Sequence, residues 1–171
     1  MFPQPQPVIP YGEQTPTTAL ETESGHRSVR GILTEGRFLV FQDTGSGGLG
    51  LGVPNTQGQS DRLSHPTLVA SPVPSSKEAD LTLRFVIFEQ AIFPEPKYQI
   101  RSAFLDASSS FLDSNLEFTS QDQAATFTIT YNPDGTSYTV QVESSGKYVS
   151  IEGERVSLSS SPFEFFIFSV T

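Results

Sequence analysis

The sequence contains no cysteine and no tryptophan, and it has a single methionine. Without cysteine the chain cannot form a disulfide framework or a thiolate metal site. The two histidines, His26 and His65, lie far apart in polar segments and lack the spacing that is typical of a zinc site. We therefore expect neither a cofactor nor a resident metal ion.

Basic residues are also few. Ten lysines and arginines oppose 19 aspartates and glutamates, which gives a formal net charge of −9. Nucleic-acid phosphates and anionic membrane surfaces both require a basic protein surface. The charge balance therefore predicts no nucleic-acid partner and no membrane partner.

Long apolar runs are missing as well. No run approaches the ~18 apolar residues that are needed to span a bilayer. The first segment, MFPQPQPVIPYG, has neither the basic region nor the apolar core of a secretory signal. Together with the absence of cysteine, these features predict a cytoplasmic protein, and secretion of a processed form stays open.

Alternating apolar residues are what the chain does contain. No window of eleven or more residues shows an apolar period of 3.6, whereas segments such as 81–88, 127–131 and 138–142 alternate with period two. Fourteen phenylalanines and five tyrosines supply much of the expected core volume. The sequence predicts an all-β fold of about twelve short strands.

The N-terminal 25 residues differ from the rest. Pro3, Pro5, Pro7 and Pro10 alternate with polar residues, which is typical of an extended, polyproline-like segment. We interpret residues 1–25 as an N-terminal arm, which is either disordered or packed across the domain. Residues 26–171 are predicted to form a single domain.

An internal repeat organises this domain. Three segments begin with an aromatic residue and precede a turn and a second strand: Phe38–Phe41, Phe104–Ala107 and Tyr148–Ile151. Three later segments have the pattern Phe-x-Ile: Phe85–Ile87, Phe127–Ile129 and Phe165–Ile167. The spacing predicts three unequal four-stranded repeats, about 26–93, 94–135 and 136–171, whose closing strands meet in one core.

The third repeat is the clearest. It contains Gly146-Lys147-Tyr148-Val149-Ser150, then Glu152-Gly153, then Phe165-Phe166-Ile167. Over residues 146–170 this stretch resembles repeats of the β-trefoil superfamily, especially its fascin-like and ricin-B-like lectin branches. The ricin-type Gln-x-Trp motif is absent, since the chain has no tryptophan. A β-sandwich is the rival all-β fold.

The resemblance implies a β-trefoil-like fold and a non-enzymatic binding function. The partner would be a carbohydrate, as in lectins, or a protein. A protease inhibitor of the β-trefoil type is an alternative within the same superfamily.

A long irregular segment interrupts the first repeat. Residues 54–80 contain four prolines among polar residues and predict a long loop with a short apolar patch at 68–70. Loops carried on a rigid scaffold are where binding residues usually lie. Asp61, Arg62 and His65 are therefore the candidate ligand-binding residues.

The segment Asp43-Thr44-Gly45-Ser46 resembles the catalytic loop of aspartic proteases. The resemblance implies that Asp43 activates water, and that a homodimer supplies the second carboxylate of a retropepsin-like enzyme. Gln42 stands where that family has an apolar residue, and no supporting apolar-apolar-Gly segment follows. The alternative is a hairpin turn, in which aspartate and glycine are the expected residues. We favour the turn and expect no enzymatic activity.

The acidic residues of the last repeat have a plainer interpretation. Glu152, Glu154 and Glu164 are expected at solvated turn or face positions. Phenylalanines occur on both faces of the final strand, so at least one of them is expected at the surface, against another segment or in a partner interface.

Overall fold

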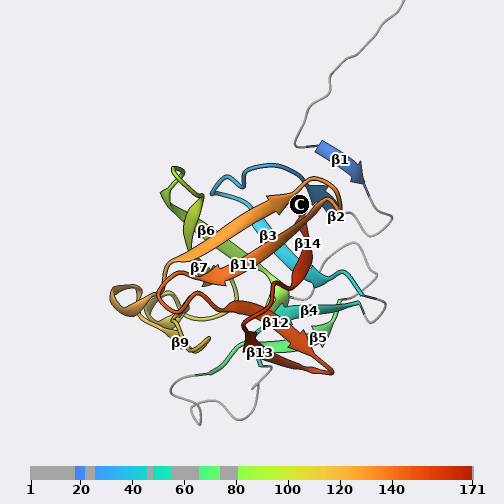
Figure 1. Ribbon diagram of the computed structural model, residues 1–171. Coiled ribbons are helices and arrows are strands. Elements are labelled where there is room, and N and C mark those ends of the chain that lie inside the picture. Colours follow the sequence, from blue (N-terminus) through green and yellow to red (C-terminus); the bar gives the residue numbers. More distant parts are fainter. Residues whose placement is uncertain (1–17, 22–25, 46–47, 55–65, 74–80, 171) are drawn as a thin grey trace, which may run out of the picture.

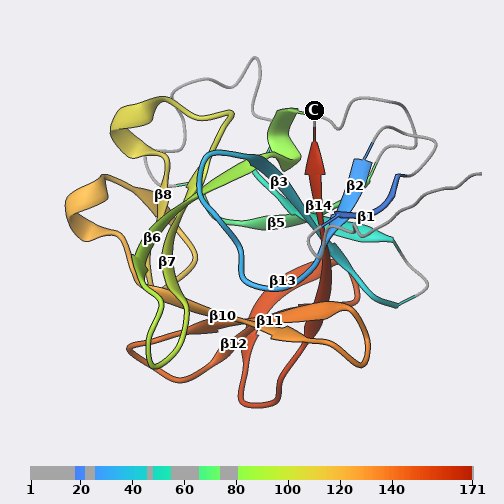
Figure 2. The ribbon, with the colours of Figure 1, turned by 90° about the horizontal axis from the view of Figure 1, so that it is seen from above.

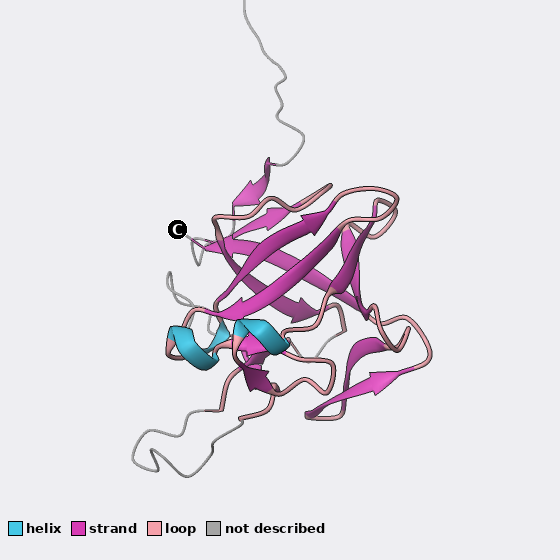
Figure 3. Cartoon of the chain, turned by 90° about the vertical axis from the view of Figure 1, so that its left-hand side faces the viewer, coloured by secondary structure: helices cyan, strands magenta, loops and turns pink. Residues whose placement is uncertain are grey.

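The computed structural model describes residues 18–21, 26–45, 48–54, 66–73 and 81–170. These residues form fourteen strands of one sheet, accompanied by three short 3-10 turns, η2 (Leu81–Leu83), η3 (Ala107–Ser109) and η4 (Gln121–Gln123). Strands account for most of the regular structure in Figure 3. The predicted all-β class is confirmed.

Six strands close into a ring. In order around the ring they are β3 (Phe38–Asp43), β6 (Phe85–Ala91), β7 (Lys97–Ser102), β10 (Phe127–Asn132), β11 (Ser137–Val142) and β14 (Glu164–Val170). Strand β14 pairs with β3 over six residues and so completes the closure. Figure 2 shows the pairs β6–β7, β10–β11 and β3–β14 around the centre of the molecule. Closure removes the exposed edges that an open sheet would have.

Each remaining pair of strands between two ring strands is a hairpin. The three hairpins are β4 (Leu49–Gly52) with β5 (Val69–Pro72), β8 (Phe111–Leu112) with β9 (Phe118–Thr119), and β12 (Tyr148–Glu152) with β13 (Arg155–Ser159). The sequence order is therefore ring strand, hairpin, ring strand, three times over. We call β3–β6, β7–β10 and β11–β14 units 1, 2 and 3.

Two further strands lie outside these units. Strand β2 (His26–Val29) pairs with the end of β14, and β1 (Thr18–Glu21) pairs with β2 (Figure 1). These four residues of β1 are the part of the predicted N-terminal arm that the structure describes. The other residues of the arm lie outside the described ranges.

The register inside each unit is the same. The second residue of the first ring strand faces the phenylalanine of the second ring strand: Leu39 and Phe85, Tyr98 and Phe127, Tyr138 and Phe165. All six side chains are buried in one core. The predicted convergence of the three Phe-x-Ile segments on a single core is therefore confirmed.

Aromatic contacts fill the centre of this core. Phe41 meets the rings of Phe85 and Phe165 edge to face, with centroid distances of 5.9 and 6.4 Å. Phe85 also stacks on Phe118 at 6.4 Å. The residual cavity between these side chains measures about 10 Å³ and has an apolar lining, so the core is close to fully packed.

The segment between β2 and β3 is tied to two core tyrosines. The hydroxyl of Tyr98 donates a hydrogen bond to the carbonyl oxygen of Leu33 at 2.8 Å, and that of Tyr138 donates to Gly31 at 2.6 Å. Leu33 itself is buried in the core. Each of the two tyrosine hydroxyls thus has the hydrogen-bond partner that a buried hydroxyl needs. The equivalent residue of unit 1, Leu39, makes no such bond because it has no hydroxyl.

Strand β4 approaches its neighbours too closely for larger residues. A Cβ atom on Gly50 would lie 2.7 Å from Val73 Cγ2, and one on Gly52 would lie 2.8 Å from Leu83 Cδ2. The alternation of leucine and glycine over residues 49–53, which predicted a strand, therefore also reflects tight packing against the segments that follow.

The predicted alignment of the repeats is wrong in two places. Phe38–Phe41 belongs to ring strand β3, whereas Tyr148–Ile151 belongs to hairpin strand β12, so the two segments are not equivalent. Phe104–Ala107 runs between β7 and β8 and is not a strand. Phe38 and Phe104 are both exposed. A leading aromatic residue therefore does not distinguish ring strands, hairpin strands and connections, since one segment of each kind begins with an aromatic residue here.

The predicted loop 54–80 also needs correction. Its apolar patch forms strand β5, which pairs with β4, and Thr67 forms an isolated bridge with Glu117 of unit 2. The sequence did not predict this strand, because it has only four residues, is partly buried and lies among proline and polar residues. Residues 55–65 and 74–80 lie outside the described part of the chain.

Candidate functional site

A groove of about 480 Å³ lies where unit 1 meets unit 3. One wall comes from the turn after β3, with Asp43, Thr44 and Gly45. The others come from Gly153 in the β12–β13 turn and from Phe163 and Glu164 at the start of β14. Antiparallel pairing of β3 with β14, in which Asp43 faces Phe165, holds the walls together. The groove therefore combines residues that are more than a hundred positions apart.

Asp43 ends its ring strand in a side-chain-to-backbone turn. Its Oδ1 accepts a hydrogen bond from the backbone N–H of Gly45. Ser102 ends β7 in unit 2 in the same way, since its Oγ accepts the N–H groups of Phe104 and Leu105 at 3.0 and 3.2 Å. Short polar side chains commonly stabilise turns by such bonds. This geometry favours the turn interpretation of Asp43.

Glu164 is fixed from unit 3. Its carboxylate accepts hydrogen bonds from the hydroxyl of Ser137 and from Asn132 Nδ2, the latter at 3.3 and 3.4 Å. Asn132 ends β10 and Ser137 begins β11, and the two residues face each other across the turn that joins these strands. Glu164, which was expected at a solvated turn or face position, is thus half-buried, and its carboxylate is oriented and still has acceptor capacity that these contacts do not use.

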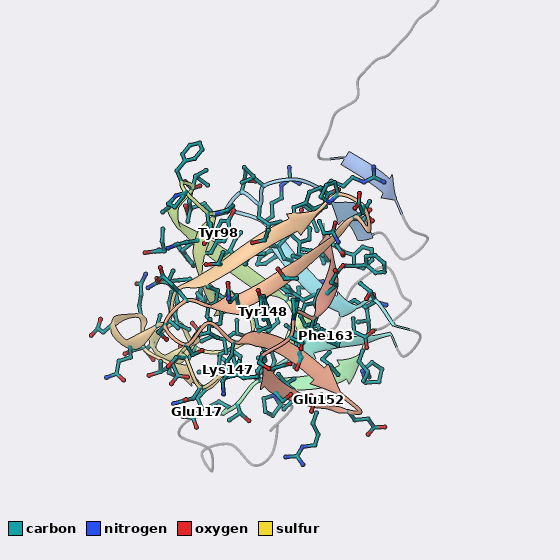
Figure 4. The ribbon with its side chains drawn as sticks, viewed as in Figure 1. Tyr98, Glu117, Lys147, Tyr148, Glu152 and Phe163 are labelled. Atoms are coloured by element: carbon teal, nitrogen blue, oxygen red, sulfur yellow. The ribbon has the colours of Figure 1, made fainter. Side chains whose placement is uncertain are left out.

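Phe163 (labelled in Figure 4) supplies the aromatic surface of the groove. Its ring lies 5.1 Å from that of Phe165, at an interplanar angle of 60°. Phe165 is fully buried, whereas Phe163 is only partly buried. One side of the Phe163 ring is therefore anchored on the core while another borders the groove.

The charge of the groove is of one sign. Among the described residues that line it, Asp43 and Glu164 are the ionisable ones, and none is a lysine or an arginine. Within the described ranges neither carboxylate takes part in an ion pair. The described residues also contain no cluster of three or more His, Asp or Glu side chains that could hold a metal ion.

Two other surface features are notable. A smaller groove of about 200 Å³ lies between the start of β5 and the turn before β13, and includes Glu154 and Arg155. Phe93, in the turn between β6 and β7, is 86% exposed. No helix in the described part of the chain is both long and apolar enough to cross a membrane.

The residues that line this groove are not the ones that the sequence proposed for binding. Asp61, Arg62 and His65 lie outside the described residues. Sequence reasoning missed Glu164 and Phe163 as a pair with Asp43, because only the β3–β14 pairing brings them together. The sequence signal that could have indicated these residues is Pro162-Phe163-Glu164, in which an aromatic and an acidic residue follow a proline at the start of the last strand.

Comparisons with known proteins give a fold relationship alone. No family model matches the chain, and no curated protein matches it. Among solved structures, a Caenorhabditis elegans protein of unknown function superposes with a TM-score of 0.54 at 13% identity. The superposition covers 80% of this chain and 95% of that protein. At this identity the likeness concerns the arrangement of strands and carries no functional information.

The turn role of Asp43 makes a testable prediction. Asp43→Ala removes the acceptor for the Gly45 N–H, and we expect it to lower the free energy of unfolding by about 1 kcal/mol. Asp43→Asn keeps a side-chain carbonyl oxygen at the same place and should change it by less than about 0.5 kcal/mol. Urea titrations of the three proteins measure both values. Equal stability of the alanine variant and the wild type would contradict the turn role.

Proposed function

We propose that this protein is a β-trefoil module without catalytic activity, which binds carbohydrate in the groove between units 1 and 3. The β-trefoil assignment is supported by the closed ring of six strands and the three hairpins. It is also supported by the repeated register, in which Leu39, Tyr98 and Tyr138 face the three core phenylalanines.

The combination of side chains in the groove carries the functional proposal. A sugar has apolar C–H faces, which pack on aromatic rings, and hydroxyl groups, which donate to carboxylates. Phe163 offers such a ring, and Asp43 and Glu164 offer acceptors whose orientation is fixed by Gly45 and by Ser137. The volume of about 480 Å³ lies within the range of small-molecule sites.

The same contacts support a binding role over a catalytic one. Asp43 holds its own turn, and Glu164 is held by Asn132 and Ser137. An aspartic protease instead needs two carboxylates that share a proton. Cleavage of a denatured protein at acid pH, abolished by Asp43→Asn, would establish the enzyme alternative in place of this proposal.

Phe163→Ala tests the binding proposal directly. A glycan array with the wild-type protein identifies the sugars that bind, and calorimetric titration with the best of them gives the affinity. We expect Phe163→Ala to weaken binding by about tenfold or more, because it removes the stacking surface. A wild-type protein that binds no glycan at high concentration would contradict the proposal.

Phe93→Ala is the matched control for that experiment. The same side chain is removed, but from a position that is 86% exposed and belongs to a different turn. Its affinity for the glycan should equal that of the wild type. If both variants lose affinity equally, the effect does not come from the groove.

The exposed turn of Phe93 favours a second candidate function, which is binding of a protein. Aromatic side chains are enriched among the residues that dominate protein interfaces. Pro94 and Pro96 follow Phe93 and restrict the conformations of the turn. Inhibition of a protease that accepts apolar side chains, lost in Phe93→Ala and kept in Phe163→Ala, would support an inhibitor of the β-trefoil type.

A further inference from the structure

The electrostatic character of the groove narrows the class of carbohydrate. We infer that the groove prefers sugars with a free, protonated amino group over neutral sugars, and neutral sugars over acidic ones. This inference rests on the proposed carbohydrate-binding function of the same groove, and it names the substrate class within that function.

The first argument is the charge of the lining. Asp43 and Glu164 are both half-buried, and the described lining of the groove includes no lysine or arginine that could balance their charge. A carboxylate next to low-dielectric protein attracts a cation more strongly than one in open water. Hydrogen bonds between an ammonium group and a carboxylate are also stronger than those between neutral groups.

The second argument is the hydrogen bonding that the carboxylates already have. Asp43 Oδ1 accepts one bond from Gly45, and Glu164 accepts bonds from Ser137 and Asn132. An ionised carboxylate has about four acceptor positions. Every donor is neutral, so the contacts fix the two side chains without cancelling their charge. Both groups therefore stay available to a positively charged ligand.

The third argument is the position of the aromatic ring. Phe163 borders the same groove as the two carboxylates, and its ring is held against Phe165. The face of an aromatic ring attracts cations as well as C–H groups. The net charge of −9 also attracts positively charged ligands over a longer range. Binding of an acidic sugar is thus disfavoured by the aromatic ring, by the two carboxylates and by the net charge of the protein.

The test compares three disaccharides of the same linkage, built from glucosamine, from N-acetylglucosamine and from a uronic acid. Titrations followed by NMR give each affinity, and the backbone amides of Gly45 and Phe163 report whether the groove is occupied. We expect the glucosamine disaccharide to bind about tenfold more tightly than its N-acetylated form at low salt. The ratio should fall as the ionic strength rises.

Two variants separate the groove from general attraction by an acidic protein. Glu164→Gln should reduce the preference for the amino sugar, because it removes one charge from the groove. Asp122→Asn removes the same charge from an exposed position in η4, outside the groove, and should leave the preference unchanged. Thermal unfolding confirms that both variants are folded.

The outcomes distinguish the two proposals. Binding of the N-acetylated disaccharide as tightly as the amino form, or a preference that Glu164→Gln does not alter, overturns the inference and leaves the carbohydrate-binding function standing. Absence of shifts at Gly45 and Phe163 with all three disaccharides overturns the inference together with the function on which it rests.

Discussion

Replacing Phe85 with alanine is expected to lower the free energy of unfolding by about 3–5 kcal/mol. The side chain is 1% exposed and contacts the rings of Phe41 and Phe118. The core around it has a residual cavity of only about 10 Å³. The substitution therefore removes buried apolar surface and leaves a cavity that the closed ring of strands cannot easily fill.

Phe93→Ala is again the control for this substitution. It deletes the same side chain where that side chain is 86% exposed, so the free energy of unfolding should change by less than about 0.5 kcal/mol. Urea titrations at equal protein concentration measure both differences. A loss below about 1 kcal/mol for Phe85→Ala would mean that the aromatic centre of the core does not hold the three units together.

The part of the fold that sequence could predict is the part with a local signal. Period-two alternation located β10, β11 and the first half of β6, whereas Leu81–Leu83, at the start of the alternating segment 81–88, form the 3-10 turn η2. The Asn-Pro-Asp-Gly sequence located the turn between β10 and β11. Inward positions of ring strands are apolar, so the core phenylalanines of the Phe-x-Ile segments were identifiable. Each of these features is determined by residues that lie within a few positions of one another in the sequence.

The alignment of unit 1 failed for a physical reason. The predicted first repeat began at about residue 26, whereas unit 1 begins with β3 at Phe38, and its second hairpin strand, β5, is short and only partly buried. Phe38 was aligned with Phe104 and Tyr148, although the three lie in a ring strand, a connection and a hairpin strand. Composition does not indicate which aromatic residue faces inward when the strand boundaries are displaced by several residues.

The candidate groove could not be predicted from local patterns. Its walls include Asp43 and Phe163, at the ends of the first and last ring strands, whose pairing brings them together, and Gly153 from the β12–β13 turn. Asp43 was identified as a candidate residue only through the resemblance of its sequence to a protease loop. The structure gives it a turn partner, Gly45, and a neighbour, Glu164, that the sequence placed in solvent.

Alkaline pH is expected to destabilise the protein through its two core tyrosines. Burial, aided by the negative charge of Glu89, raises the pKa of Tyr98 from about 10 to about 12. Burial also raises the pKa of Tyr138, with smaller contributions from Tyr131 and Tyr98. In the unfolded chain the two tyrosine hydroxyls ionise near pH 10, whereas in the folded protein both are still protonated at that pH. Stability is therefore unaffected by these groups below about pH 9 and falls as the pH rises toward 12.

Because the pKa of Tyr98 rises from about 10 to about 12 on folding, full ionisation of this residue is expected to lower the free energy of unfolding by roughly 3 kcal/mol. Tyr138 adds to it in the same direction. The pKa of Lys97 is also raised, chiefly by its hydrogen bond to Glu143, so the tyrosine contribution must be isolated by substitution. Urea titrations between pH 8 and pH 12 measure the dependence.

Tyr98→Phe and Tyr138→Phe isolate that contribution. Each removes the hydroxyl that donates to Leu33 or Gly31 and should cost about 1–2 kcal/mol at pH 8. Each variant should also lose less stability than the wild type between pH 10 and pH 12, because it has one fewer buried group to ionise. A variant that is destabilised at pH 8 but keeps the full alkaline slope would show that the slope comes from other groups. The prediction therefore requires both the stability at pH 8 and its loss between pH 10 and pH 12. The same two hydroxyls bind the segment between β2 and β3 and have pKa values that burial raises, so each substitution should change both quantities.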